Sequence, residues 1–213
     1  MSFPDRCKVN KFIPKKTFYE KIGVSSAIKD EFINDIEKIT WLYKLSEDTL
    51  GITKTEQTEE IQVFEVILKN KKLPKNIIKI ISKSIPYKIL FILKFKDEFC
   101  YSIKVEDVYF TEWNEEIKIN LSGLTLDTIY ENIVKSIIKE QDNDRDFDYI
   151  IESKCRRDDL LKKIEQLKYK INNEKQFNRK VELNEKLNLL YDEMERMLNE
   201  WKNWNLYEKS KRK

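Results

Sequence analysis

The sequence contains no histidine among its 213 residues. This absence excludes histidine-based general acid–base catalysis, Ser-His and Cys-His nucleophilic systems, and histidine-ligated metals. Glycine and proline are also scarce, with three Gly and four Pro in the whole chain. Such a composition argues against a loop-rich sandwich and against a glycine-rich phosphate-binding loop.

Cysteine is limited to Cys7, Cys100 and Cys155, which lie far apart and form no CxxC pair. We therefore expect neither a disulfide framework nor a zinc site, and a reducing cytosol fits this usage best. The segment MSFPDRCKVNKF lacks the apolar region of a signal peptide, and no uninterrupted apolar run approaches bilayer length. The sequence thus predicts a soluble cytoplasmic protein without membrane contact.

What the chain does have is a strongly apolar stretch at residues 61–105, around which the predicted fold is built. Residues 61–69 and 87–95 carry apolar side chains at odd and even positions, which indicates strands covered on both faces. Residues 74–84 between them have the spacing of an amphipathic helix. Strand, helix and strand predict a right-handed parallel pair, in which the carboxylate Glu65 interrupts the first apolar run.

The other segments of the first 140 residues add helices and antiparallel strands. Before the central stretch we expect an irregular segment (residues 3–12), two helices (14–21 and 25–39), a strand (41–45) and a polar connection (47–59). After it we expect three antiparallel strands (residues 99–105, 108–113 and 117–121) and a final helix (125–137). The predicted fold class is α+β, a mixed sheet with helices packed on it.

The segment QDNDRDFD breaks the hydrophobic pattern and marks the expected domain boundary. We assign residues 1–140 to a globular domain, 141–154 to an acidic linker and 155–213 to a helical region. Two apolar series in that region, beginning at Leu160 and Leu187, have heptad-like spacing but are out of register with each other. The offset predicts an antiparallel, coiled-coil-like helical hairpin with a frayed basic end.

Several phrases, in chain order, resemble an uncharacterised prokaryotic family, domain of unknown function 4391. They span nearly the whole chain and read IPKKTFYE, DIEKITWLYKLSEDTL, EIQVFEVILK, IPYKILFILKF, LSGLTLDTIYENIV and EKQFNRKVELNEKL. The family has no established activity or catalytic residues. The resemblance implies a gene context instead, since similar proteins are encoded beside helicase-like ATPases and DNA methyltransferases in restriction or phage-defence clusters.

Candidate residues for a nuclease site are charged groups on or near the first central strand: Glu65, Lys69 and Glu37. Restriction nucleases use strand carboxylates to hold Mg²⁺ and a lysine to assist the attacking water. They place the acid and the lysine two residues apart, whereas Glu65 and Lys69 are four apart. Asp48 is another conceivable acid. Glu60 and Gln62 are two residues apart, as the site requires, but Gln62 stands where the site needs a lysine. We favour a structural charge pair at Glu65 over this reading.

Alternating acids in the linker are similar to the start of a calcium loop: Asp142, Asp144, Asp146 and Asp148. Phe147 replaces the required glycine, and Ser153 stands where the loop needs its last glutamate. A solvated linker is the better interpretation. The sequence therefore predicts no metal site and no cofactor, apart from Mg²⁺ if the chain is a nuclease.

The region from residue 155 onward holds 16 Lys and Arg against 11 Asp and Glu, so it is mildly basic. Candidate nucleic-acid contacts on it are Arg156, Arg157, Lys162, Lys163, Lys168, Lys170, Arg179 and Lys180. The interspersed acids are equally typical of a solvent-exposed helical hairpin. Trp201 and Trp204 end its apolar seam and are candidate anchors for a protein partner.

The missing histidine and the heptad-patterned helices favour a non-catalytic accessory or adaptor protein. The family resemblance implies that it would belong to a helicase- or methyltransferase-associated DNA restriction or phage-defence system. Its helical hairpin would contact a partner protein, and DNA contact stays open. The first alternative is a Mg²⁺-dependent nuclease with a restriction-endonuclease-like core. The second is a homodimeric scaffold held together through the C-terminal helices. Most of the sequence information therefore concerns the fold and the surface, and little of it concerns catalysis.

Overall fold

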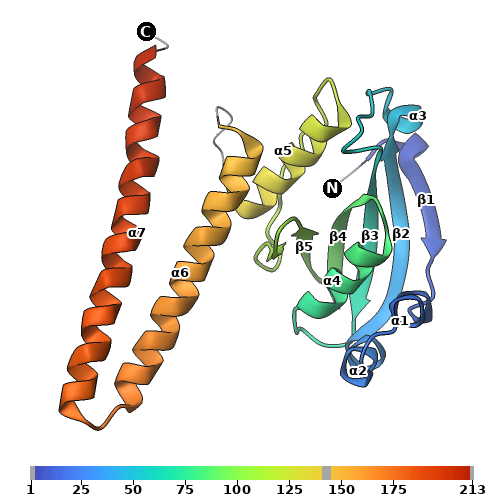
Figure 1. The fold of residues 1–213 in the computed structure, drawn as a ribbon. Helices are drawn as coiled ribbons and strands as arrows, with labels where there is room; N and C mark the ends of the chain where they lie inside the picture. The colour runs from blue at the N-terminus through green and yellow to red at the C-terminus, as the bar shows by residue number, and fades with distance from the viewer. Residues whose placement is uncertain (1–2, 141–144, 212–213) are drawn as a thin grey trace. The chain divides into compact units, whose positions relative to one another are not determined.

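Residues 3–140 and 145–211 are described by a computed structural model, except for the side chains of residues 21–22 and 200–211. The chain divides into two compact units, residues 1–144 and 145–213. The first unit holds a mixed β-sheet with helices packed on it, and the second holds two long helices (Figure 1). This is the α+β fold that the sequence predicts.

A six-stranded sheet forms the centre of the first unit, and its strands lie side by side in sequence order. They are β1 (Lys8–Phe12), β2 (Ile36–Ser46), β3 (Glu60–Leu68), β4 (Lys88–Phe95), β5 (Glu98–Lys104) and β6 (Val108–Phe110). All neighbouring pairs are antiparallel except β3 and β4, which are parallel. Helix α4 (Lys75–Ser84) connects these two strands, so the predicted strand–helix–strand unit is confirmed.

Helices cover the face of the sheet on which Phe64 and Phe91 lie. They are α1 (Lys16–Ile22), α2 (Ser26–Asp35) and α4. Figure 1 shows α4 lying across the central strands. Its side chains Ile77, Ile78 and Ile81 recur at helical spacing and are fully buried, and each contributes about 2 kcal/mol by leaving water.

The opposite face of the sheet is covered in part by helix α5 (Leu126–Ile138). The strand register places Ile61 opposite Lys88 on β4, and the Lys88 ammonium lies 5.0 Å from the ring centre of Tyr130 on α5. Ile61 and Val63, which lie on this face, are fully buried. Towards the other end of β3 the same face carries Glu65, whose side chain is 15% exposed. The cover on this face is therefore incomplete at Glu65.

Two predictions for the N-terminal part are wrong. Residues 8–12 were expected to be irregular, but they form the edge strand β1. The second helix ends at Asp35 and not near residue 39, because Ile36 and Ile39 belong to β2 and are fully buried in the sheet. The polar connection after β2 also contains a one-turn helix, α3 (Glu47–Leu50), and a short 3-10 helix, η1 (Asp5–Cys7), precedes β1.

The strand predicted for residues 117–121 is absent, although these residues alternate in polarity. They run without regular structure beside α5, where the Ser136 hydroxyl donates to the Lys118 carbonyl at 3.2 Å. The contact to α5 takes the place of strand pairing for this carbonyl. The sheet therefore ends at the three-residue strand β6.

The second unit is a pair of helices, α6 (Phe147–Asn173) and α7 (Phe177–Lys211), which run side by side in opposite directions (Figure 1). Ile164, Ile171 and Leu187 form their common apolar core, as the two offset series predict. The Asp146 carboxylate caps α6 by accepting from two backbone amides. Residues 147–154, assigned to the linker from sequence, are thus helical, and linker residues 141–144 lie outside the described residues.

Candidate functional site

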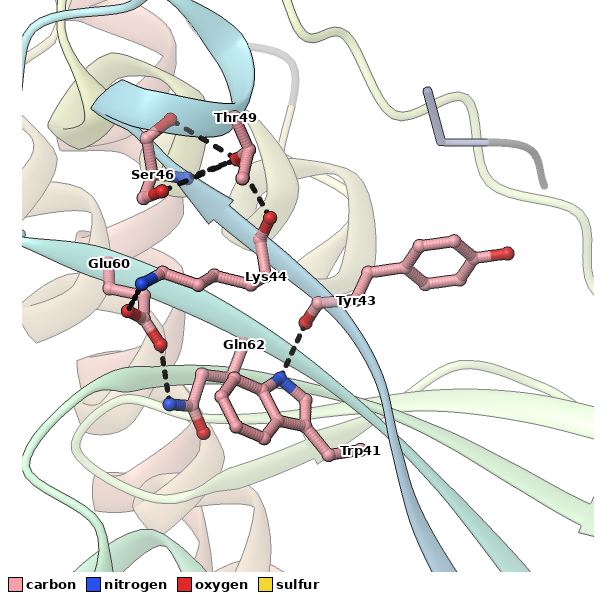
Figure 2. A network of polar contacts seen from close by, with 7 residues as sticks. All are labelled: Trp41, Tyr43, Lys44, Ser46, Thr49, Glu60 and Gln62. Atoms are coloured by element: carbon pink, nitrogen blue, oxygen red, sulfur yellow. Dashed lines mark hydrogen bonds and ion pairs between the residues drawn. The ribbon is translucent and has the colours of Figure 1, made fainter. Parts of the chain in front are cut away.

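A network of polar side chains joins β2 to β3 at the point where β3 begins (Figure 2). Glu60 Oε2 lies 3.0 Å from Lys44 Nζ, and Gln62 Nε2 donates to Glu60 Oε1 at 2.6 Å. The Glu60 side chain is 10% exposed, so this carboxylate is withdrawn from water. The antiparallel register pairs Lys44 with Gln62 and Ser46 with Glu60, which brings the ion pair together diagonally across the two strands.

The ion pair fixes the charge of the lysine. The hydrogen bond to Glu60 and its negative charge raise the pKa of Lys44, with smaller contributions of the same sign from Asp48 and Tyr87 and an opposing one from burial. Lys44 therefore remains an ammonium throughout the neutral range. A buried carboxylate held by an ammonium on one oxygen and an amide on the other is a rigid arrangement.

The end of β2 that carries Lys44 is itself held in place by hydrogen bonds. The Thr49 hydroxyl donates to the Lys44 carbonyl at 2.9 Å and accepts from the Ser46 amide at 2.9 Å. Three residues before Lys44, the Trp41 indole donates to the Tyr43 carbonyl at 2.8 Å, at a bulge in the β2–β3 ladder. Figure 2 shows the side chains of Trp41 and Tyr43 pointing to opposite sides of β2.

A hollow of about 200 Å³ lies beside this network, and its lining residues are Glu56, Gln57, Thr58, Glu59, Glu60, Pro86, Tyr87 and Lys88. Three of the lining side chains are carboxylates and one is an ammonium, so the hollow carries net negative charge. Glu60 is the only one of these acids that is buried. Such a lining suits a cation better than a phosphate.

The three residues of the predicted nuclease site do not converge. Glu65 Oε2 lies 2.6 Å from Lys94 Nζ on β4, whereas Lys69 Nζ donates to the Ile33 carbonyl at 2.8 Å. No hydrogen bond or ion pair joins Glu37 to either of them within the described residues. Glu65 is thus a paired carboxylate, and these three side chains do not fit a Mg²⁺ ion together.

Glu65 nevertheless lines a solvent-open pocket of about 360 Å³ on the partly covered face of the sheet. Seven of its ten lining residues are aromatic or aliphatic, and the full lining is Phe3, Leu42, Tyr43, Glu65, Ile92, Lys94, Phe99, Tyr101, Glu116 and Ile117. Burial, and to a smaller extent the charge of Glu116, raise the pKa of Tyr101. The pocket lies on the half of this face that is not buried beneath α5.

The candidate nucleic-acid contacts all lie on α6, on α7 or in the turn between them, and several are paired with acids. Arg156 lies 3.3 Å from Glu193, Lys162 lies 3.2 Å from Asp159, and Arg179 lies 3.5 Å from Glu174. Lys168 sits over the Tyr191 ring at 5.5 Å. Lys163, Lys170 and Lys180 are exposed, whereas Arg157 is half-buried. The hairpin surface is therefore mixed in charge and not a continuous basic stripe.

The same two helices expose several large apolar side chains: Leu161, Tyr169, Phe177, Val181, Leu189, Tyr191 and Leu198. Phe177 and Tyr169 are the most exposed, at 78% and 72%. Trp201 and Trp204 lie on the part of α7 whose side chains fall outside the described residues. Within the described residues, the exposed apolar groups of the hairpin are therefore ones that the sequence did not single out.

Sequence reasoning missed Lys44 as the basic partner of Glu60. The interval between Glu60 and Gln62 was visible in the sequence, but the lysine comes from the neighbouring strand. Only the register between β2 and β3 places it there. Across the described residues, no three side chains of the kinds that bind metals gather at one point, and no helix is both long and apolar enough to cross a membrane.

Comparison with known proteins gives one match. A family model described as a domain of unknown function (DUF4391) matches residues 1–194, which is nearly the whole chain. No curated protein and no solved structure matches this chain.

Proposed function

Because the chain belongs to the DUF4391 family, we propose that it is an accessory or adaptor protein of a DNA-directed restriction or phage-defence system. Its partner in this proposal is a helicase-like ATPase or a DNA methyltransferase, as the gene context of similar proteins implies. The protein would act by holding its partner and would not itself catalyse a reaction. It would work in the cytoplasm, where such systems meet DNA.

The observation that carries this proposal is the set of exposed apolar side chains on the helical hairpin. Tyr191 and Leu198 are seven residues apart on α7 and share a helix face next to the seam residue Leu187. Phe177 and Val181 are further exposed apolar side chains of α7, nearer the turn. Large apolar groups that remain exposed in an isolated chain are typical of a protein interface.

The mixed charge of the hairpin supports the protein partner more than DNA. Arg156 and Arg179 already have acidic neighbours, which reduces the charge they offer to phosphates. The exposed Lys163, Lys170 and Lys180 could add salt-dependent contacts to DNA that the partner holds. DNA contact is therefore proposed as a secondary contribution from these lysines.

The test is affinity capture of the tagged full-length protein from its native organism, with identification of the recovered proteins. We expect a helicase-like ATPase or a DNA methyltransferase, and its loss when Tyr191→Ser and Leu198→Ser are combined. Glu182→Gln, an exposed substitution on the side of α7 opposite Tyr191, is the control and should retain the partner. Recovery of neither protein class would contradict the proposal. A dimer in light scattering with no partner would favour the homodimeric scaffold.

A second candidate function, a Mg²⁺-dependent nuclease, is favoured by one specific observation. Glu60 and Gln62 have the two-residue interval of restriction-nuclease strands, and the Lys44 ammonium lies beside them from β2. Both Glu60 oxygens are engaged, so an ion at this carboxylate would have to displace Lys44. The fit to Mg²⁺ is therefore poorer than that of an open carboxylate pair.

The nuclease alternative is tested by incubating plasmid DNA with the purified chain in Mg²⁺ or Mn²⁺. Cleavage that is lost in Glu60→Gln but kept in Glu65→Gln would establish it at this site. Cleavage that is lost in Glu65→Gln but kept in Glu60→Gln would place the catalytic site at Glu65 instead. Absence of cleavage with either ion would leave the accessory role as the conclusion.

A further inference from the structure

The pocket around Glu65 has a construction that the accessory role does not explain. Its floor is one row across three strands, since the register aligns Glu65 on β3 with Ile92 on β4 and Tyr101 on β5. The β2 bulge pairs Trp41 with Phe64 and then Tyr43 with Val63, so the Tyr43 side chain joins this face. A regular strand at this point would have kept Tyr43 out of the pocket.

Two pairs of aromatic rings line the pocket, one including Tyr43 on β2 and the other on β5. The rings of Phe3 and Tyr43 are 5.0 Å apart, and those of Phe99 and Tyr101 are 5.6 Å apart in an edge-to-face arrangement. All four residues line the pocket together with Glu65. Rings of this kind offer flat apolar surface and a negative face to a ligand.

The charges in the pocket favour a cation. Glu65 and Glu116 are carboxylates, and Lys94 is the single basic side chain in the lining, so one negative charge is left in excess. Lys94 pairs with Glu65 Oε2, while Glu65 Oε1 has no hydrogen-bond partner among the described residues. The carboxylate is mostly buried but opens into the pocket. Glu65 Oε1 can therefore accept a hydrogen bond from a ligand that enters the pocket.

We propose that this pocket binds a guanidinium group, namely an arginine side chain presented by a partner protein. A guanidinium is planar, stacks on aromatic rings and donates two parallel hydrogen bonds to carboxylates. An ammonium shares the charge but not the flat surface, and a phosphate is repelled by the excess negative charge. Presentation by a partner rests on the proposed accessory function, whereas the preference for guanidinium rests on the pocket alone.

The experiment is a titration of the isotope-labelled full-length chain with N-acetylarginine methylamide, followed by NMR of the aromatic rings. We expect saturable shifts at Tyr43, Phe99 and Tyr101. The neutral citrulline analogue has nearly the same shape and should bind about tenfold more weakly, because it lacks the charge. The lysine analogue should also bind more weakly than arginine, because it cannot stack.

Two variants test the carboxylate in opposite directions. Glu65→Gln should weaken arginine binding about tenfold by removing the negative charge. Lys94→Gln should strengthen it, because it frees Glu65 Oε2 and removes the competing cation; a variant that merely unfolds could not give this gain. Glu112→Gln, an exposed charge-matched substitution outside the lining, is the control and should change nothing.

The proposal is overturned if citrulline and arginine analogues bind equally, if Glu65→Gln leaves binding unchanged, or if Lys94→Gln weakens it. Adenosine binding in preference to the arginine analogue would also overturn it and identify a base-stacking pocket. Arginine binding by the free chain is independent of the hairpin. It can therefore succeed where capture of a helicase or methyltransferase partner fails, and the two outcomes remain distinguishable.

Discussion

Lys44 on β2 and Glu60 on β3 form an ion pair of 3.0 Å across neighbouring antiparallel strands, and Gln62 completes the contacts of the Glu60 carboxylate. The two partners are sixteen positions apart in the sequence, and the register of the β2–β3 ladder brings them together. The carboxylate is buried, while the lysine reaches it from a half-exposed position. Removing Lys44 would therefore leave the buried carboxylate poorly solvated, whereas the lysine without Glu60 can still reach water.

We predict that Glu60→Leu lowers the free energy of unfolding by about 2 kcal/mol, because it leaves Lys44 and the Gln62 amide without their acceptor. The double variant Lys44→Met with Glu60→Leu should lose less than the sum of the two single losses. Urea unfolding of all four proteins measures the coupling. Strict additivity of the two losses would show that the pair contributes nothing.

The pH dependence of this pair follows from the raised pKa of Lys44. A group whose pKa is higher in the folded state stabilises the fold fully below its unfolded pKa, and the contribution disappears as pH rises through the folded pKa. We expect the stability difference between wild type and Lys44→Met to be constant from pH 7 to pH 9, about a unit or more below the unfolded lysine pKa. It should shrink only at more alkaline pH. Shrinkage already near neutral pH would contradict this assignment.

A second charge cluster ties α4 to the loop between β5 and β6. Asp107 accepts from Lys75 at 2.5 Å and pairs with Lys79 at 3.0 Å. Burial alone would raise the pKa of Asp107, but Lys75, the Val108 amide and Lys79 outweigh it and hold the pKa well below its ordinary value. A depressed carboxyl pKa stabilises the fold above the unfolded pKa, and this stabilisation is lost as pH falls through the folded pKa.

Asp107→Asn should therefore cost about 1 kcal/mol at pH 7, a figure reduced for the partial exposure of both lysines. The cost should decrease steadily below about pH 4, as the wild-type carboxyl becomes protonated in the unfolded chain. Thermal unfolding of both proteins between pH 7 and pH 3 is the measurement. A loss that is the same at all these pH values would show that Asn disturbs packing and not charge.

The cysteines should differ sharply in reactivity. Cys100 is fully buried, and burial raises its pKa to about 12, so it holds little of the reactive thiolate at neutral pH. Cys7 is 1% exposed, whereas Cys155 on α6 is half-buried. In the folded protein at pH 8, we expect only Cys155 to react fast with a thiol reagent. In denaturant, all three cysteines should react. Peptide mapping identifies the site, and fast modification of Cys100 would contradict the burial.

The hairpin should depend on a small apolar core. Ile171→Ala removes a buried side chain near the turn and should destabilise the two helices by about 3 kcal/mol. Amide hydrogen exchange should then accelerate in α6 and α7, while β3 and β4 keep their protection. Gln166→Ala, an exposed substitution on α6, is the control. Faster exchange throughout the sheet as well would show that the two units unfold together.

Local patterns were sufficient for the central part of the fold. The two-sided apolar runs of β3 and β4 and the amphipathic α4 between them have no other good arrangement, because each apolar face has to be covered. The helical hairpin was also predictable, since two seams out of register cannot continue along one straight helix. In both cases the information lies in residues close together in the chain.

Tertiary structure decided the elements that depend on a partner. β1 is polar and mostly exposed, and it becomes a strand because the edge of β2 offers it backbone hydrogen bonds. Ile36 and Ile39 fit a helical stripe equally well, and pairing with β3 assigns them to β2. Residues 117–121 alternate like a strand but lie beside α5, where Lys118 bonds to Ser136. Propensity does not distinguish these outcomes without the neighbouring chain.

The polar sites show the same division. The sequence by itself identified Glu65 as the carboxylate that interrupts an otherwise apolar strand, because a charge stands out in an apolar run. It singled out Glu60 only for its two-residue interval to Gln62. Their partners, Lys94 and Lys44, come from neighbouring strands. Ion pairing depends on distances of a few ångströms, and only the strand register and the β2 bulge set those distances.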